Sequence, residues 1–210
     1  MLRNLSKYIL LSGILILPLI YWPKGEVPYE LPKVWFFQRL VEVLGILGTW
    51  KFLKEKQKYL SRRNDKVLIF LIFIFLFFGI VSSLLGVDFT KSIFGNYYRH
   101  DGLITLFHFA VFFFFLNLFW EKSWEKSLFL AISLGCFLTS LWTVGLGFRF
   151  HILKDYSIYH FGNALGGTFG QPNFLAGYLL VCLPFSAYFV SKSRCLGEKF
   201  FLVACFISSY

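Results

Sequence analysis

Apolar residues in this chain form long uninterrupted runs, unlike the alternation of a strand or the one-sided stripe of a surface helix. Uncharged runs cover residues 67–86, 103–120, 127–148 and 172–191 and contain 18 to 22 residues each. About 20 apolar residues are needed to cross the hydrocarbon core of a membrane. These four runs therefore predict transmembrane helices.

Two further runs precede them and are less pure. Residues 8–22 follow two basic residues and lack a small-residue cleavage site, so they predict a retained first helix rather than a signal peptide. We expect Pro18 to kink that helix. Residues 34–50 predict a second helix. A seventh run, residues 200–210, has only eleven residues.

The second run carries a polar face. Arg39 lies three residues from Glu42 and Gln38 four, so on a helix all three side chains lie near one face and can pair. Ionisable groups at membrane depth usually face the bundle interior or a water-filled cavity. The alternatives are an interfacial helix, or an Arg–Glu pair that only locks two helices together.

The predicted fold class is all-α, a polytopic transmembrane helical bundle with six complete spans and a truncated seventh. We expect residues 1–210 to form a single transmembrane domain, the N-terminal part of a longer membrane protein. Outer loops are predicted over approximately 87–102 and 149–171.

The distribution of basic residues predicts the topology. The formal net charge is +10, with the main basic run over residues 51–66. If that run is cytoplasmic, the inner side holds 14 Lys and Arg and the outer side six, with Arg39 counted within the membrane. The positive-inside rule then gives a cytoplasmic N-terminus. Because the basic residues separate apolar runs, they argue against nucleic acid as a partner.

Composition agrees with a membrane protein, since 57% of the residues are hydrophobic and 15% are charged. The four cysteines predict neither a disulfide framework nor a metal site, because none lies in a predicted outer loop and paired C-x-x-C spacing is missing. They are Cys136, Cys182, Cys195 and Cys205.

A glycine-rich stretch, residues 166–177 with the sequence GGTFGQPNFLAG, precedes the sixth predicted span. Its first three glycines permit backbone geometry that bulky residues resist, and Pro172 suits the first turn of a helix. We predict a flexible entry loop followed by a membrane helix, whose N-terminal N–H groups offer an anion site if that end is outside. The alternative is a loop joined to a helix with no binding role.

Two strings together resemble a known family. GTFGQPNFLAGYLL, preceded in an earlier outer loop by SIFGNYYRHDGLITL, is similar to motifs of the O-antigen ligase and polymerase family of polytopic membrane proteins. The resemblance covers these two loops and the helices that follow them. Topology, deduced from charge alone, places both loops on the same side.

The resemblance implies glycosyl transfer in the bacterial inner membrane. The donor would be an undecaprenyl-diphosphate-linked glycan and the acceptor lipid A core, a glycan or a protein, with no metal ion or nucleotide cofactor. In the family, the base is a histidine in a later outer loop. We therefore expect the catalytic residues beyond residue 210, do not assign His151 or His160 as the base, and expect residues 1–210 alone to be inactive.

The same resemblance points to four substrate-binding residues: Arg99, Gly170, Gln171 and Asn173. Arg99 matches the arginine of the earlier motif and can hold a phosphate bidentately, or can form a structural salt bridge to Asp88 or Asp101. Gln171 and Asn173 match the amides of the second motif, and we expect helix capping or glycan hydrogen bonds from them.

Two other functional classes remain open at this stage. Half of a transporter or flippase would use the polar face of the second helix and the glycine-broken entry to the sixth to line a path. A non-enzymatic membrane scaffold would need neither. An enzyme predicts an outer loop rich in Arg and His downstream, whereas a transporter predicts a second set of helices with inverted topology.

Overall fold

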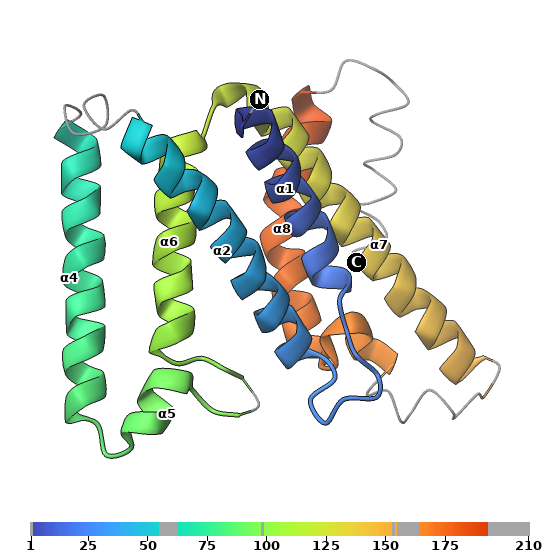
Figure 1. Cartoon of the computed structure of the whole chain (residues 1–210). Helices are drawn as coiled ribbons and strands as arrows, with labels where there is room; N and C mark the ends of the chain where they lie inside the picture. The colour runs from blue at the N-terminus through green and yellow to red at the C-terminus, as the bar shows by residue number, and fades with distance from the viewer. Residues whose placement is uncertain (1, 55–62, 98, 153, 155–163, 193–210) are drawn as a thin grey trace. The chain divides into compact units, whose positions relative to one another are not determined.

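A computed structural model describes the chain except residues 1, 55–62, 98, 153, 155–163 and 193–210 (Figure 1). The described residues form helices joined by turns and short loops, and no strand occurs among them. The all-α fold class is therefore confirmed for this part of the chain. The predicted seventh run lies outside the described residues.

Two prolines lie at helix boundaries: the boundary at Pro172 was predicted, whereas Pro18, expected to kink the first helix, instead follows its end. Helix α1 (Leu2–Ile16) ends just before Pro18, which lies in the single 3-10 turn η1 (Leu17–Leu19). Helix α8 (Pro172–Lys192) begins at Pro172. The proline ring fixes φ and removes the N–H, which is harmful inside a helix but costs nothing at its first position.

The prediction of six complete spans is wrong by the criteria of length and hydropathy. Among the described residues, only two helices are long and apolar enough to cross a membrane, Val67–Leu85 and Lys122–Arg149. Helix α1 has 15 residues and α6 (Leu103–Phe119) has 17. Helix α8 has 21 residues, of which the length criterion applies to the stretch Pro172–Tyr188. Helix α2 (Glu30–Lys54) is 25 residues long, but charged side chains interrupt it.

Contacts group the chain into two compact units, where the sequence predicted one transmembrane domain. Unit 1 comprises residues 1–10 and 34–121, and unit 2 comprises residues 11–33 and 122–210.

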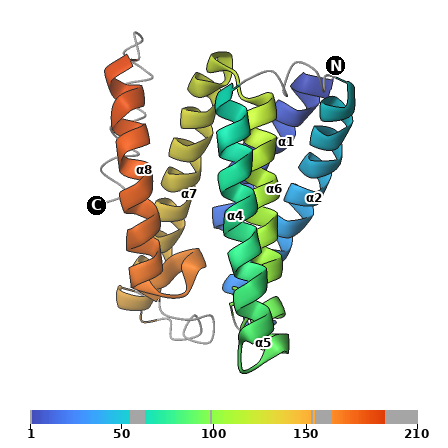
Figure 2. The same cartoon turned by 90° about the vertical axis from the view of Figure 1, so that its left-hand side faces the viewer.

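In unit 1, α4 (Arg63–Leu85) and α6 lie side by side, and the short helix α5 (Phe89–Phe94) joins them (Figures 1 and 2). The predicted outer loop 87–102 therefore contains a helical turn. The rings of Phe37 and Phe109 pack 4.8 Å apart between α2 and α6. Buried Phe115 and Phe119 of α6 stack on each other, and Gly48 of α2 lies beside them. Aromatic packing thus holds α2 on α6.

One ion pair in unit 1 links the N-terminal segment to the connection after α6. Arg3 Nη1 lies 2.9 Å from Glu121 Oε1, so the N-terminal segment lies next to the connection that follows α6. The charge count predicted both on the cytoplasmic side, and that stays a prediction. The exposed pair itself contributes little to stability.

In unit 2, helix α7 (Glu125–His151) follows the short turn η2 (Lys122–Trp124) and packs lengthwise on α8 (Figure 2). The buried hydroxyls of Ser133 and Ser186 lie 3.1 Å apart across the two helices. The turn η4 (Ala164–Phe169) packs against both α7 and α8. Its position brings the glycine-rich stretch onto the C-terminal half of α7.

Candidate functional site

The glycine-rich stretch is a packed turn. Gly166, Gly167 and Thr168 are buried, and Gly167 and Gly170 have φ values of 53° and 72°. A Cβ added to Gly167 would lie 2.1 Å from Thr143 Oγ1, and one added to Gly170 would lie 2.3 Å from the Tyr29 ring. The predicted flexible entry loop is therefore wrong: glycine is required here for close packing at positive φ.

A lysine that the sequence analysis did not select holds this turn in place. Lys33 Nζ donates hydrogen bonds to the carbonyl oxygens of Ile20 (2.6 Å), Thr168 (2.6 Å) and Tyr29 (3.3 Å). Its ammonium also lies 4.9 Å from the centre of the Phe169 ring. Three N–H donors meet three acceptors, so the half-buried ammonium is fully satisfied.

Thr168 adds a second link to the same segment. Its hydroxyl donates to the carbonyl oxygen of Pro18 at 2.7 Å, in a buried hydrogen bond. The segment between α1 and α2 and the segment before α8 therefore meet at one end of unit 2. The segment before α8 belongs to the predicted outer loop 149–171.

Burial changes the acid–base properties of this cluster. Desolvation lowers the pKa of Lys33 to about 8, while nearby Glu30 opposes the shift. Desolvation, assisted by Tyr21, raises the pKa of the Tyr29 hydroxyl. In both cases burial penalises the charged form, so the low polarity of the surroundings decides the direction.

Beside the turn, unit 2 contains an open cavity of about 580 Å³. Its walls are mostly apolar, and Arg149 supplies the positive charge among them; the lining residues are Leu19, Tyr21, Leu138, Leu141, Trp142, Gly145, Leu146, Arg149 and Thr168. Six of them recur at helical spacing along one face of α7. At 1.5 Å per residue, the stretch from 138 to 149 makes this wall about 16 Å long.

Aromatic rings connect the cavity with the glycine-rich turn. The Tyr21 ring lies 6.0 Å from that of Trp142 and stacks on that of Tyr29 at 6.4 Å. Tyr29 in turn fills the space over Gly170. The turn, the rings and the cavity are therefore one packed structure.

Three of the four predicted binding residues lie in unit 2. Gly170 is part of the packed turn, whereas Gln171 and Asn173 are exposed at the start of α8. Neither amide side chain makes a hydrogen bond within the described part of the chain, so the capping role expected of them does not occur there. Glycan hydrogen bonding by these amides stays a prediction.

The fourth, Arg99, lies in unit 1, in a turn after α5. Its backbone N–H donates to Asn96 O at 3.0 Å and its side chain is exposed. Gly95, with φ 81°, makes the turn tight, because an added Cβ would lie 2.4 Å from the backbone nitrogen of Asp101.

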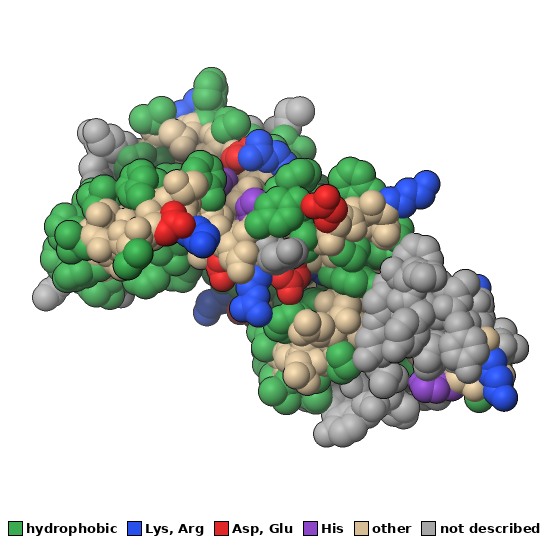
Figure 3. Space-filling model, turned by 90° about the horizontal axis from the view of Figure 1, so that it is seen from below, with side chains coloured by type: hydrophobic (Ala, Val, Ile, Leu, Met, Phe, Trp, Pro, Cys, Tyr) green, Lys and Arg blue, Asp and Glu red, His purple; other side chains and the backbone are tan. Residues whose placement is uncertain are grey.

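The alternative salt bridge from Arg99 to a neighbouring aspartate is not formed in the described residues. Asp88 caps α5 by accepting from Lys91 N at 3.0 Å, and its carboxylate pairs with Lys91 Nζ at 3.6 Å. The bond from the Lys91 backbone N–H holds the pKa of Asp88 below its usual range. Asp101 accepts from the backbone N–H of Asn96 at 3.2 Å. Figure 3, seen from the α5 end, shows acidic and basic side chains close together among hydrophobic ones.

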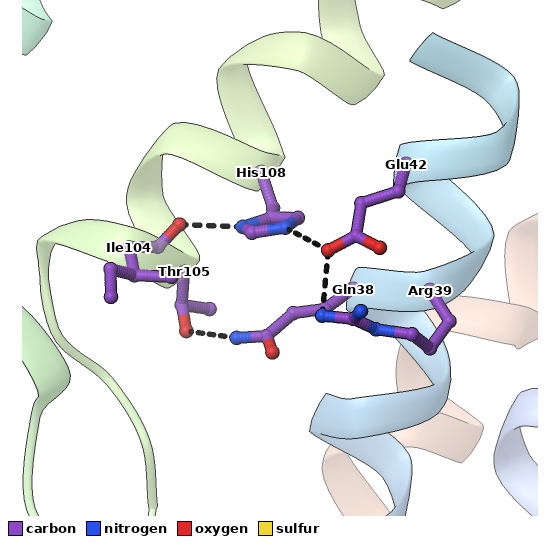
Figure 4. A network of polar contacts seen from close by, with 6 residues as sticks. All are labelled: Gln38, Arg39, Glu42, Ile104, Thr105 and His108. Atoms are coloured by element: carbon purple, nitrogen blue, oxygen red, sulfur yellow. Dashed lines mark hydrogen bonds and ion pairs between the residues drawn. The ribbon is translucent and has the colours of Figure 1, made fainter. Parts of the chain in front are cut away.

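The predicted polar face of α2 is confirmed in unit 1 (Figure 4). Arg39 Nη2 lies 2.6 Å from Glu42 Oε1, and the same oxygen lies 3.4 Å from His108 Nε2 of α6. The Gln38 amide donates to the Thr105 hydroxyl of α6 at 3.2 Å. The polar face therefore meets a matching set of side chains on α6.

The other histidines and cysteines considered in the sequence are given no role. His151 is exposed at the end of α7, and His160, Cys195 and Cys205 lie outside the described residues. Cys136 and Cys182 are buried and form no disulfide within the described residues. Within the described ranges, no group of three or more His, Cys, Asp or Glu side chains is arranged to hold a metal ion.

Sequence reasoning missed Lys33, Arg149 and Tyr29. Lys33 and Arg149 were counted only as charges that orient the chain, although each borders a predicted outer segment. Their position at the ends of apolar runs next to glycine or aromatic residues is the signal that could have marked them. Comparisons with protein-family models, with curated proteins and with solved structures found no match to this chain.

Proposed function

We propose that this chain is a membrane-embedded part of an O-antigen ligase-like glycosyltransferase in the bacterial inner membrane. It binds an undecaprenyl-diphosphate-linked glycan on the outer face, for transfer to lipid A core, a glycan or a protein. The chain contributes the binding of the donor, and the catalytic residues are unassigned.

The surface of α4 supports membrane residence. The helix is apolar all round, yet only 6% of the span Val67–Leu85 is buried within the chain. Phe73 and Phe78, for example, are 72% and 64% exposed. A helix of this composition is stable either in a protein core or in lipid. Because this chain does not cover it, lipid is the environment we propose.

The observation that carries the donor proposal is the cavity of about 580 Å³ in unit 2. A lipid diphosphate needs an apolar wall for its hydrocarbon and a cation for its phosphates. The face of α7 provides the wall, and Arg149 provides a guanidinium that can hold phosphate oxygens bidentately. Arg149 also lies in the last turn of α7, where a cation is favoured by the helix dipole.

Arg99, in unit 1, is proposed separately as a phosphate-binding residue. Its side chain is exposed and forms no ion pair within the described residues, so a phosphate would not have to displace a partner. The adjoining tight turn at Gly95 fixes the backbone from which it projects. A lysine at this position should replace it poorly, because a point charge cannot form the two parallel bonds.

Two glycines of α7 allow a matched test. Gly145 lines the cavity and Gly147 does not, and a Cβ added to either meets no atom within 4 Å. Gly145→Leu should fill part of the cavity, whereas Gly147→Leu changes helix propensity equally without entering it. We would measure binding of undecaprenyl diphosphate to each variant in lipid nanodiscs.

The expected result is at least tenfold weaker binding for Gly145→Leu and wild-type binding for Gly147→Leu. Arg149→Ala should weaken binding more than Arg149→Lys. Equal binding by the two glycine variants would contradict the proposal that the lipid binds in this cavity.

A further inference from the structure

The ring of His108 in unit 1 contacts two acceptor groups, a backbone carbonyl oxygen and the carboxylate of Glu42. His108 Nδ1 lies 2.7 Å from the carbonyl oxygen of Ile104, one turn earlier in α6. His108 Nε2 lies 3.4 Å from Glu42 Oε1 (Figure 4). The imidazole side chain is 13% exposed, whereas the Glu42 side chain is 40% exposed, so the carboxylate is the more open of the two partners.

A neutral imidazole has one N–H group, which is too few to donate to both of its partners. A carbonyl oxygen can only accept, so Nδ1 must carry a hydrogen and donate it to Ile104 O. A neutral imidazole has no second hydrogen, and its Nε2 then presents a lone pair to the carboxylate. Two lone pairs form no bond. The contact is favourable only when one additional proton lies between Nε2 and Oε1.

Arg39 decides which of the two atoms carries that proton. Its Nη2 lies 2.6 Å from the same Oε1, which favours the charged carboxylate. The proton therefore belongs on Nε2, so that the cluster consists of a guanidinium, a carboxylate and an imidazolium. Among the described residues, Arg39 is the one other titratable side chain in contact with this pair. Helices α4 and α5, which also pack on α6, contribute none.

The pair also lies at the wall of a cavity. Glu42 and His108 both line a cavity of about 690 Å³ formed by α2 and α6. The other lining residues are apolar except Thr49; they are Val41, Gly45, Ile46, Trp50, Leu53, Phe107 and Val111. A proton can therefore reach the pair without α2 and α6 separating completely. Elsewhere the two helices are held by the neutral bond from Gln38 to Thr105 and by aromatic packing at Phe37.

We propose that Glu42 and His108 form a proton-binding site between α2 and α6, with Arg39 keeping the proton on the imidazole. When the proton leaves, two lone pairs face each other and α2 loosens from α6 at the cavity. This site is independent of the glycan-donor proposal, because it uses other residues in the other unit and requires no lipid-linked ligand.

The test is the protonation state of one ring. The 210-residue chain, labelled with ¹⁵N in its histidine rings, is placed in lipid nanodiscs at pH 7, and His108→Gln identifies the signals of His108. We expect hydrogens on both ring nitrogens of His108 in the wild type. In Glu42→Gln the amide N–H₂ can donate to Nε2, so the contact survives without the extra proton and Nε2 should become unprotonated.

A matched control separates a proton site from a structural link. Gln38→Leu removes the neighbouring interhelical bond one turn away on α2 and should leave both hydrogens on His108. A wild-type ring with an unprotonated Nε2 would overturn the proposal, as would a Glu42→Gln ring that keeps both hydrogens. The wild-type spectrum alone is decisive if a variant fails to fold.

Discussion

Gly170→Ala tests whether the glycine-rich turn is a packed structure. The substitution places a Cβ at a φ of 72°, which costs an L-residue about 1–2 kcal/mol. It also places that atom 2.3 Å from a Tyr29 ring carbon. Relieving such overpacking typically costs about 1–3 kcal/mol. The two effects together predict a loss of about 2–5 kcal/mol in the free energy of unfolding.

Gly177→Ala is the matched control, because Gly177 lies in α8 and an added Cβ meets no atom within 4 Å. It should raise stability by about 1 kcal/mol through helix propensity. Both variants would be unfolded in mixed detergent micelles, and helix content followed by circular dichroism.

The two costs of Gly170→Ala can be separated by a second substitution. In a Tyr29→Ala background the ring is gone, so the same change should cost only about 1–2 kcal/mol for the backbone conformation. If Gly170→Ala is as stable as Gly177→Ala, the turn is not packed as described and the reasoning is wrong.

Three further predictions follow from the same structure. Because the pKa of Lys33 falls from 10.5 to about 8 on folding, the folded state loses this proton first, and stability should rise with pH between about 8 and 10.5 by on the order of 3 kcal/mol at most. The ¹³Cε chemical shift of Lys33 in lysine-labelled protein measures the pKa without changing its N–H groups, and a value near 10.5 would contradict the burial. A cysteine placed in residues 51–66 should be protected from impermeant reagents in intact cells, and labelling there would contradict the predicted cytoplasmic location of this segment. Arg99→Ala should weaken binding of undecaprenyl diphosphate, whereas Lys91→Ala, in the same loop but paired with Asp88, should not; equal losses would indicate nonspecific charge.

Local signals in the sequence predicted the start of α8, a break of helical geometry at Pro18 and the polar face of α2. Pro18 and Pro172 act through their own rings, so no information about distant residues was needed. The spacing of Arg39 and Glu42 likewise determines that they share a helix face.

Features that depend on tertiary contacts could not be predicted in the same way. The glycine-rich stretch looked flexible because its glycines permit many conformations, and only the presence of Tyr29 and Thr143 beside them selects one. Similarly, Lys33 becomes structural because three carbonyl oxygens from distant segments converge on it. Among the described residues fewer helices than predicted are long and apolar enough to span, because α1 and α6 have only 15 and 17 residues and charged side chains interrupt α2.

Ligand discrimination by the wild-type chain tests the proposed function most directly. In nanodiscs, native mass spectrometry would compare undecaprenyl diphosphate with undecaprenol, which has the same hydrocarbon and no phosphate. The proposal predicts that the diphosphate binds at least tenfold more tightly and that added salt reduces the difference, because guanidinium groups contact the phosphates. Equal binding of the two lipids, or no binding of either, would contradict it.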